Sequence, residues 1–410
     1  MASLKKNISW TFAGNVAFSA SQWLIVILIT KMLGVEQLGI YALGMAIVSP
    51  IFMFTNLSLR SVQATDVLSQ YSFTEYLSFR SLTLVVAIFV ASLFAYFSGY
   101  ERDVFLVILV LTTIKVFESI SDVYFGMYQR SEKMEMIGRS LIYRSFLSIT
   151  IAVVASIVFR DLIVILCSVV VTYLIVLMLF DMRRLDERAA LGLNIFGKKA
   201  RVTYKRLLII TFPLGVTLCI NVLYQGFPRM LLAKYHGVEL LGIFSGISYL
   251  IVVGSTVINA MGQSAIPRLA KYAKKGQNDF DKLLSKLFFM SMVVGVLGIL
   301  FAAVFSDLFL SFVYSSEFLG QRKLFVLLMV LALIMYMSGV AGSALTSMQC
   351  FKEQAYISIV CIAVLIFASF PLIKSMQAEG ATYAMTIAYG MKLIFELITV
   401  YFKRSKFLVR

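Results

Sequence analysis

Apolar residues in this chain gather in long runs, with short polar stretches between them. A helix needs about 20 mostly apolar residues to cross the hydrocarbon core of a bilayer, and the runs reach this length. Twelve such runs lie at 8–30, 39–62, 77–98, 104–128, 137–159, 162–180, 207–232, 240–262, 283–305, 324–349, 355–373 and 380–402. The pattern therefore predicts an all-α integral membrane protein with about twelve transmembrane helices.

The two halves of the chain repeat each other. Residues 34–40 read GVEQLGI and residues 237–243 read GVELLGI, an offset of 203 positions (237 minus 34). Half-length repeats are typical of transporters built from two similar helical bundles. Since each half holds an even number of spans, the two start on the same side of the membrane. We expect six-helix bundles over 1–180 and 207–410, related by a parallel pseudo-twofold repeat.

Composition and charge exclude a soluble protein. Hydrophobic residues make up 60% of the chain, and its mean hydropathy is +0.90. In a soluble protein the net charge of +16 would indicate a nucleic-acid partner, but here most basic residues lie between the spans. Cytoplasmic loops of membrane proteins carry such an excess. We therefore expect membrane lipids and no nucleic acid as partners, a basic cytoplasmic linker over 181–206, and both termini in the cytoplasm.

Polar residues inside the second span are the first candidates for a site. An ionisable group at the membrane centre costs roughly 2.5–3.5 kcal/mol on insertion scales, so such groups are functional candidates. Asn56 and Arg60 are four residues apart and are expected on one helical face. At the repeat offset they become Asn259 and Gln263. Arg60 also lies close enough to the end of its span for the side chain to reach the membrane surface.

The fourth span carries three ionisable residues at spacings of three and four, Lys115, Glu118 and Asp122. These spacings place all three on one face. Lys115 and Glu118 can neutralise each other, which leaves Asp122 for Arg60 or Arg144. Two interpretations stay open for Glu118 and Asp122: a structural ion pair, or a site that gains and loses a proton and so could serve ion coupling.

The seventh span combines two of the chain's five prolines, Pro213 and Pro228, with polar residues between them. Proline removes a backbone hydrogen bond and kinks a helix, so this span is a candidate moving element. It carries Gln225, which matches Gln22 of the first span, and Arg229 near its outer end. Single amides on membrane helices more often join helices than bind ligands, but these recur in both halves.

Basic groups outnumber acidic ones within or beside the spans. Seven basic residues (Arg60, Arg80, Lys115, Arg139, Arg144, Arg229 and Lys392) stand against Glu118, Asp122 and Glu396, a balance of +4 (7 − 3). A cavity lined by these residues would attract anions, and guanidinium forks fit phosphate oxygens. The residues expected to line it are Arg60, Arg144, Arg229, Lys115, Asn56, Gln22, Gln225, Asn259 and Gln263. We expect no metal site, catalytic set or cofactor.

Two segments carry a family resemblance. Residues 28–66, LITKMLGVEQLGIYALGMAIVSPIFMFTNLSLRSVQATD, resemble the N-terminal signature of the polysaccharide biosynthesis and export family, the O-antigen (Wzx-type) flippases of the MOP exporter superfamily. Residues 118–140, ESISDVYFGMYQRSEKMEMIGRS, are similar to the junction between its fourth and fifth spans. MATE antiporters and the lipid II flippase are relatives. The resemblance implies two six-helix bundles around a cationic central cavity.

The resemblance also implies a substrate. It would be an undecaprenyl-diphosphate-linked oligosaccharide, such as an O-antigen or capsule unit, carried outward across the bacterial cytoplasmic membrane. Coupling to a proton or sodium gradient and association with the glycan polymerase machinery are further expectations. Arg60 inherits the role of the family's second-span arginines, whereas Gln263 at the matching position breaks any symmetric arginine pair.

Two other classes of protein remain in view. A membrane-embedded glycan transferase or polymerase would need clustered acidic or histidine residues. The chain has a single histidine, His236, which we expect to be solvated in an outer loop, and it has neither HExxH nor a P-loop. A MATE-type cation antiporter would need acidic lining residues, the opposite of the balance found. The sequence therefore favours a transporter of anionic lipids over an enzyme.

Overall fold

The computed structural model describes residues 4–66, 70–182, 198–275 and 277–407, and nearly all of them are helical. The chain forms two compact units, 1–226 and 227–410. Most of the expected basic linker, residues 183–197, lies outside the described residues.

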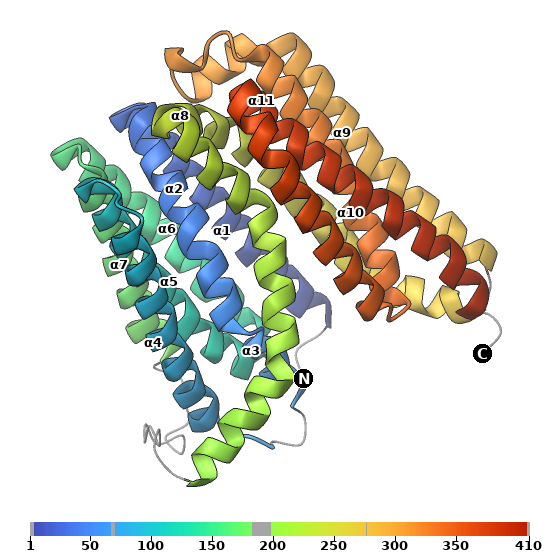
Figure 1. Cartoon of the computed structure of the whole chain (residues 1–410). Coiled ribbons are helices and arrows are strands. Elements are labelled where there is room, and N and C mark those ends of the chain that lie inside the picture. Colours follow the sequence, from blue (N-terminus) through green and yellow to red (C-terminus); the bar gives the residue numbers. More distant parts are fainter. Residues whose placement is uncertain (1–3, 67–69, 183–197, 276, 408–410) are drawn as a thin grey trace. The chain divides into compact units, whose positions relative to one another are not determined.

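The first unit contains the N-terminal helices (Figure 1). These are α1 (Leu4–Leu33), α2 (Val35–Asn56), α3 (Leu59–Thr65), α4 (Phe73–Phe97), α5 (Arg102–Arg130), α6 (Met134–Phe159), α7 (Leu162–Val176), the π-helix η1 (Leu177–Asp181) and the start of α8 (Lys198–Lys275). Helix α5 packs against α2, α3, α4 and α7. Polar side chains from these helices can therefore meet against α5.

The second unit holds the rest of α8 and the remaining helices. They are α9 (Gln277–Val313), the short 3-10 helix η2 (Ser316–Phe318), α10 (Arg322–Ser347) and α11 (Phe351–Phe407). Helix α10 packs against both α9 and α11.

Ten helices in the described part of the chain are long and apolar enough to cross a membrane. Two of them are far too long for one crossing, with 72 and 54 residues, and each contains a break. The breaks lie at Gly237 and Gln377, where the backbone leaves the helical region. Each break divides its helix in two, so the ten correspond to the twelve expected runs. The predicted all-α membrane fold is confirmed.

The repeated glycine motif has a structural basis. Gly34 ends the turn between α1 and α2 with φ 91° and ψ 176°, and Gly237 in α8 has nearly the same angles, φ 86° and ψ 172°. Residues with a Cβ atom rarely adopt this backbone conformation, whereas glycine does so at little cost in free energy. The motif therefore places the same turn after the first span of each half.

The polar face predicted for the second span is interrupted. Asn56 and Arg60 were expected on one continuous helix, but α2 ends at Asn56 and α3 begins at Leu59. Leu57 and Ser58 between them adopt left-handed φ angles of 53° and 51°. This conformation costs about 1–2 kcal/mol per non-glycine residue, so the surrounding contacts must hold it. The matching stretch in α8 is unbroken, which makes the halves unequal at this point.

Candidate functional site

Two guanidinium groups share one carboxylate beside the α2–α3 break. Arg80 on α4 donates from Nη1 to Asn56 Oδ1 at 2.6 Å, and its Nη2 lies 3.6 Å from Asp122 Oδ2. Arg60 on α3 places Nη1 at 3.4 Å from Asp122 Oδ1. Two positive charges and one negative charge leave this group of side chains at +1. We call Arg60, Arg80, Asp122 and Asn56 the Asp122 cluster.

Arg60 is the accessible arginine of the Asp122 cluster. Its Nε donates to Gln129 Oε1 at 3.0 Å, and its guanidinium lies over the Phe125 ring, 5.4 Å from the centroid. Both partners belong to α5, so the side chain is held against that helix. One third of the side chain, 33%, is nevertheless exposed. Part of the guanidinium fork can therefore reach a ligand.

Arg80 is fully buried and incompletely paired. Its side chain is 0% exposed, and neither Nε nor Nη2 has a hydrogen-bond partner. A buried charged group without its hydrogen bonds is costly, so this guanidinium makes the surroundings strongly attractive to an anion. From the sequence, Arg80 entered only the overall charge balance, and Gln129 was not among the predicted site residues. Their signal is tertiary: both side chains converge on the helix break.

The far end of α3 is fixed by Asp66. Its carboxylate accepts hydrogen bonds from the backbone N–H groups of Gln70 and Tyr71 and from the Tyr76 hydroxyl, and Arg130 lies 4.0 Å away. Burial alone would raise the pKa of Asp66, but these donors and Arg130 outweigh it and hold the pKa below its ordinary value of 3.8. The anchored carboxylate ties α3 to α4 and α5.

Arg144, expected in the cavity, is occupied inside the first unit. It is 2% exposed and donates to Ser121 Oγ at 2.7 Å, with Asp181 Oδ2 at 3.2 Å. Its guanidinium also lies over the Tyr173 ring, 4.5 Å from the centroid. Such burial leaves no face for a ligand, so we assign Arg144 a structural role. The partner was missed because Asp181 follows the sixth run and was counted with the linker.

The charge balance changes accordingly. Besides Asp181, Glu135 forms an ion pair with Arg139, and neither acid entered the earlier count. Adding both acids lowers the balance from +4 to +2 (7 − 5). The Asp122 cluster therefore carries a larger share of the excess than the sequence indicated.

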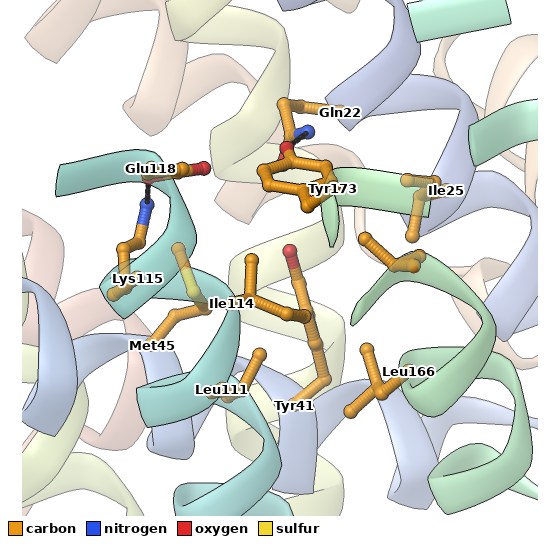
Figure 2. A pocket seen from close by; sticks show the side chains of 11 residues that line it. Gln22, Ile25, Tyr41, Met45, Leu111, Ile114, Lys115, Glu118, Leu166 and Tyr173 are labelled. Carbon is orange, nitrogen blue, oxygen red and sulfur yellow. Dashed lines mark hydrogen bonds and ion pairs between the residues drawn. The ribbon is translucent and has the colours of Figure 1, made fainter. Parts of the chain in front are cut away.

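Lys115 and Glu118 form the ion pair that their spacing predicted, with Nζ 2.6 Å from Oε2. Figure 2 shows the pair on one side of a cavity, with Tyr173 and Gln22 on another. Gln22 Nε2 donates to the Tyr173 hydroxyl at 3.4 Å. The cavity measures about 20 Å³, enough for one water molecule but far too small for a sugar or diphosphate. Its chemistry suits a proton or a water molecule.

Three further candidates lie in the second unit and are not part of the Asp122 cluster. Arg229 Nη2 donates to Ser248 Oγ at 2.9 Å, and its guanidinium lies 5.8 Å from the Tyr249 ring centroid. Asn259 and Gln263 are exposed on α8. Gln225 is half-buried at the end of the first unit. The sequence-predicted set thus divides between the two units.

His236 is not simply solvated, as the sequence led us to expect. It is partly buried, and its Nε2 lies 2.7 Å from the Ile373 carbonyl oxygen. Ile373 lies four residues before the break at Gln377, where the regular helical hydrogen bonds are interrupted. The histidine therefore joins the two broken helices of the second unit. Within the described residues no group of three or more His, Cys, Asp or Glu side chains could hold a metal ion.

Comparison with known proteins decides the family. Residues 4–273, about two thirds of the chain, match the family model described as polysaccharide biosynthesis protein. The chain belongs to the polysaccharide biosynthesis protein family. It is also 28% identical, over 392 residues, to the capsular polysaccharide biosynthesis protein CapF of Staphylococcus aureus, covering 95% of this chain and 97% of that protein.

Solved structures show the fold of this family member. The lipid II flippase MurJ, in an inward closed conformation, matches with a TM-score of 0.76 at 11% identity, covering 96% of this chain and 87% of that one. A multidrug resistance MATE family transporter of the MOP superfamily, in an inward-facing conformation, matches with a TM-score of 0.70 at 13% identity, covering 97% and 95%. This polysaccharide biosynthesis protein is therefore a multi-pass membrane protein that shares its fold with a flippase and a MATE transporter.

Proposed function

We propose that this polysaccharide biosynthesis protein is a flippase for a polyprenyl-diphosphate-linked oligosaccharide. The observation that carries the proposal is the Asp122 cluster, which keeps an excess positive charge within the membrane spans and leaves Arg60 one third exposed. Guanidinium groups bind phosphate oxygens through two parallel hydrogen bonds. The names of CapF and MurJ, a capsular polysaccharide biosynthesis protein and a lipid II flippase, support a lipid-linked glycan as the substrate class.

In this mechanism the diphosphate replaces water at Arg60, while Arg80 supplies positive potential from its buried position. The polyprenyl tail stays in the lipid, and alternating access carries the head group to the outer leaflet. The basic linker and both termini lie on the cytoplasmic side, in accord with the positive-inside rule. Glu118 is the candidate for ion coupling because it lines a water-sized cavity, whereas Asp122 is engaged by two arginines.

A MATE-type cation antiporter is the alternative with the same fold. Its substrate would need a carboxylate that is not already neutralised. Both spanning carboxylates proposed as functional have basic partners: Glu118 pairs with Lys115, and Asp122 with Arg60 and Arg80. This pairing favours an anionic substrate.

The proposal is tested with the purified full chain in proteoliposomes. We expect protein-dependent movement of a fluorescent polyprenyl-diphosphate-linked oligosaccharide between leaflets. Geranylgeranyl diphosphate should inhibit this movement by competition, whereas the organic cation rhodamine 6G should not. Transport of rhodamine 6G without movement of the lipid-linked glycan would establish the antiporter instead.

Arg60 variants test the site. Arg60→Ala should lower the flipping rate about tenfold or more, since a hydrogen bond to a charged group contributes roughly 1.5–3 kcal/mol. Arg60→Lys should recover only part of the rate, because an ammonium group lacks the guanidinium fork. Arg102→Ala, a change of the same charge at an exposed position of α5, is the matched control and should flip normally. A full rate for Arg60→Ala would remove Arg60 from the mechanism.

A further inference from the structure

We propose that Asp122 is an internal substitute for the substrate's phosphate. It holds Arg60 until a diphosphate arrives, yields Arg60 to the substrate, and takes it back when the substrate leaves. This inference rests on the proposed function. It adds a residue that lowers the affinity for the diphosphate and thereby speeds its release. Asp122 acts through Arg60, so it is a positioning residue.

The contact between Arg60 and Asp122 is suited to exchange. Charge-assisted hydrogen bonds between nitrogen and oxygen measure about 2.7–2.9 Å, but Arg60 Nη1 lies 3.4 Å from Asp122 Oδ1. The two side chains are also 33% and 29% exposed, so an incoming anion can reach between them. A phosphate that contacts both nitrogens of the fork would bind Arg60 more closely than Asp122 does.

Arg80 lowers the free-energy cost of separating Asp122 from Arg60. Removing one partner of a buried ion pair is strongly destabilising, because the other charge is left uncompensated. Asp122 avoids this loss, since Oδ2 already lies 3.6 Å from Arg80 Nη2, a nitrogen with no hydrogen-bond partner. When Arg60 turns to the substrate, Asp122 can close on Arg80. Asn56 holds Arg80 in place meanwhile, through the 2.6 Å hydrogen bond.

The position of the exchange ties it to the helix break. Asn56 is the last residue of α2, whereas Arg60 lies on α3, beyond the left-handed residues Leu57 and Ser58. Arg80 therefore holds the α2 side of the break, and Asp122 holds the α3 side. Release of Arg60 from Asp122 removes one of the contacts that fix α3 against α5.

The repeat shows that this arrangement is not a requirement of the fold. At the offset of 203, Arg60 corresponds to Gln263. The tenth run, which takes the place of the fourth in the second half, forms α10, and this helix contains no Asp or Glu. The second half therefore has the same span order without a counterpart of either Arg60 or Asp122. An arrangement that the scaffold does not need, present in one half only, is expected of a dedicated site.

The test separates affinity from turnover in Asp122→Asn. The full chain is titrated calorimetrically with geranylgeranyl diphosphate, and flipping of the lipid-linked oligosaccharide is followed in proteoliposomes. Loss of the competing charge should tighten binding of the probe at least tenfold and lower KM. It should also lower kcat, because no carboxylate remains to displace the substrate's phosphate from Arg60. A purely structural role for Asp122 would weaken binding and lower the rate together.

Matched variants complete the experiment. Asp103→Asn, an equal charge change at an exposed position of the same helix, should leave both quantities unchanged. Arg60→Ala in the Asp122→Asn background should abolish the gain in affinity. Asp122→Glu has a longer side chain that reaches closer to Arg60, so it should bind the probe several-fold more weakly than the wild type. If Asp122→Asn does not fold, Asp122→Glu tests the inference in its place.

The outcomes are distinct. Tighter binding with slower turnover in Asp122→Asn supports the inference. Unchanged or weaker binding in Asp122→Asn, or tighter binding in Asp122→Glu, overturns it and leaves the flippase proposal standing if the wild type binds the probe. No binding by the wild type overturns the proposed function, and this inference with it.

Discussion

Charged side chains inside the first unit are held in small groups of oppositely charged partners. Lys115 and Glu118 are one turn apart, so their pairing follows from the sequence alone, and the structure confirms it at 2.6 Å. Arg144 and Asp181 are 37 positions apart, and only the packing of α6 against the end of the sixth span brings them together. Local spacing predicts local partners, whereas the partner of an isolated arginine depends on which helices meet.

The Lys115–Glu118 pair makes a prediction that separates structure from coupling. Glu118→Gln leaves the Lys115 ammonium without its partner and should lower the unfolding temperature in detergent. The side chains are 22% and 23% exposed, so we expect a loss on the order of 1–2 kcal/mol, below the roughly 3–5 kcal/mol of a fully buried pair. The double variant Lys115→Met with Glu118→Gln should regain most of the stability.

Flipping by that double variant then reports on coupling. If Glu118 carries the coupling proton, the stable double variant should flip at a rate that no longer responds to an imposed pH gradient. An unaltered response would show that the pair is structural only. The wild type measured at equal pH on both sides is the reference.

At the scale of elements, breaks in helices decide where functional groups lie. The breaks at Gly237 and Gln377 were readable from the sequence, because each falls in a gap between two predicted runs. The break at Leu57–Ser58 was not, because it lies inside the run 39–62 and neither residue is a glycine or proline. Local propensity does not favour the left-handed conformations of these two residues.

His236 provides a test of how a break is stabilised. His236→Ala leaves the Ile373 carbonyl without this donor and should destabilise the protein by about 1–3 kcal/mol, read from thermal unfolding in detergent. His236→Gln can place an amide N–H at a similar position and should retain much of the stability. Lys374→Ala, an exposed change beside the same carbonyl, should have little effect. Equal stability of the alanine variant and the wild type would contradict this role.

For the whole molecule, the number of spans followed from the length of the apolar runs, and the breaks in α8 and α11 reconcile ten long helices with twelve crossings. Orientation is a separate prediction, made from the positions of basic residues. The basic linker and the loops on its side are expected in the cytoplasm.

Orientation is tested at the two ends of α5. Glu101 and Ser131 cap opposite ends of this helix, and both are exposed. In a variant without the four native cysteines, a membrane-impermeant maleimide added to intact cells should label Glu101→Cys and not Ser131→Cys. Permeabilised cells should show both labelled. The reverse pattern in intact cells would invert the proposed topology.

The sequence by itself determined the all-α membrane fold, the repeat, the excess of positive charge and the Lys115–Glu118 pair. These features depend on run length, offset and helical periodicity, which act between residues close in the chain or equivalent in the two halves. The tertiary structure decided which charges are available. It enclosed Arg144 with Asp181, buried Arg80 beside Asn56, and placed Asp122 between two arginines at a break. In a medium of low dielectric constant, the partners of a charged side chain decide whether it is available to a ligand. Partners on different helices come together only after the helices have packed.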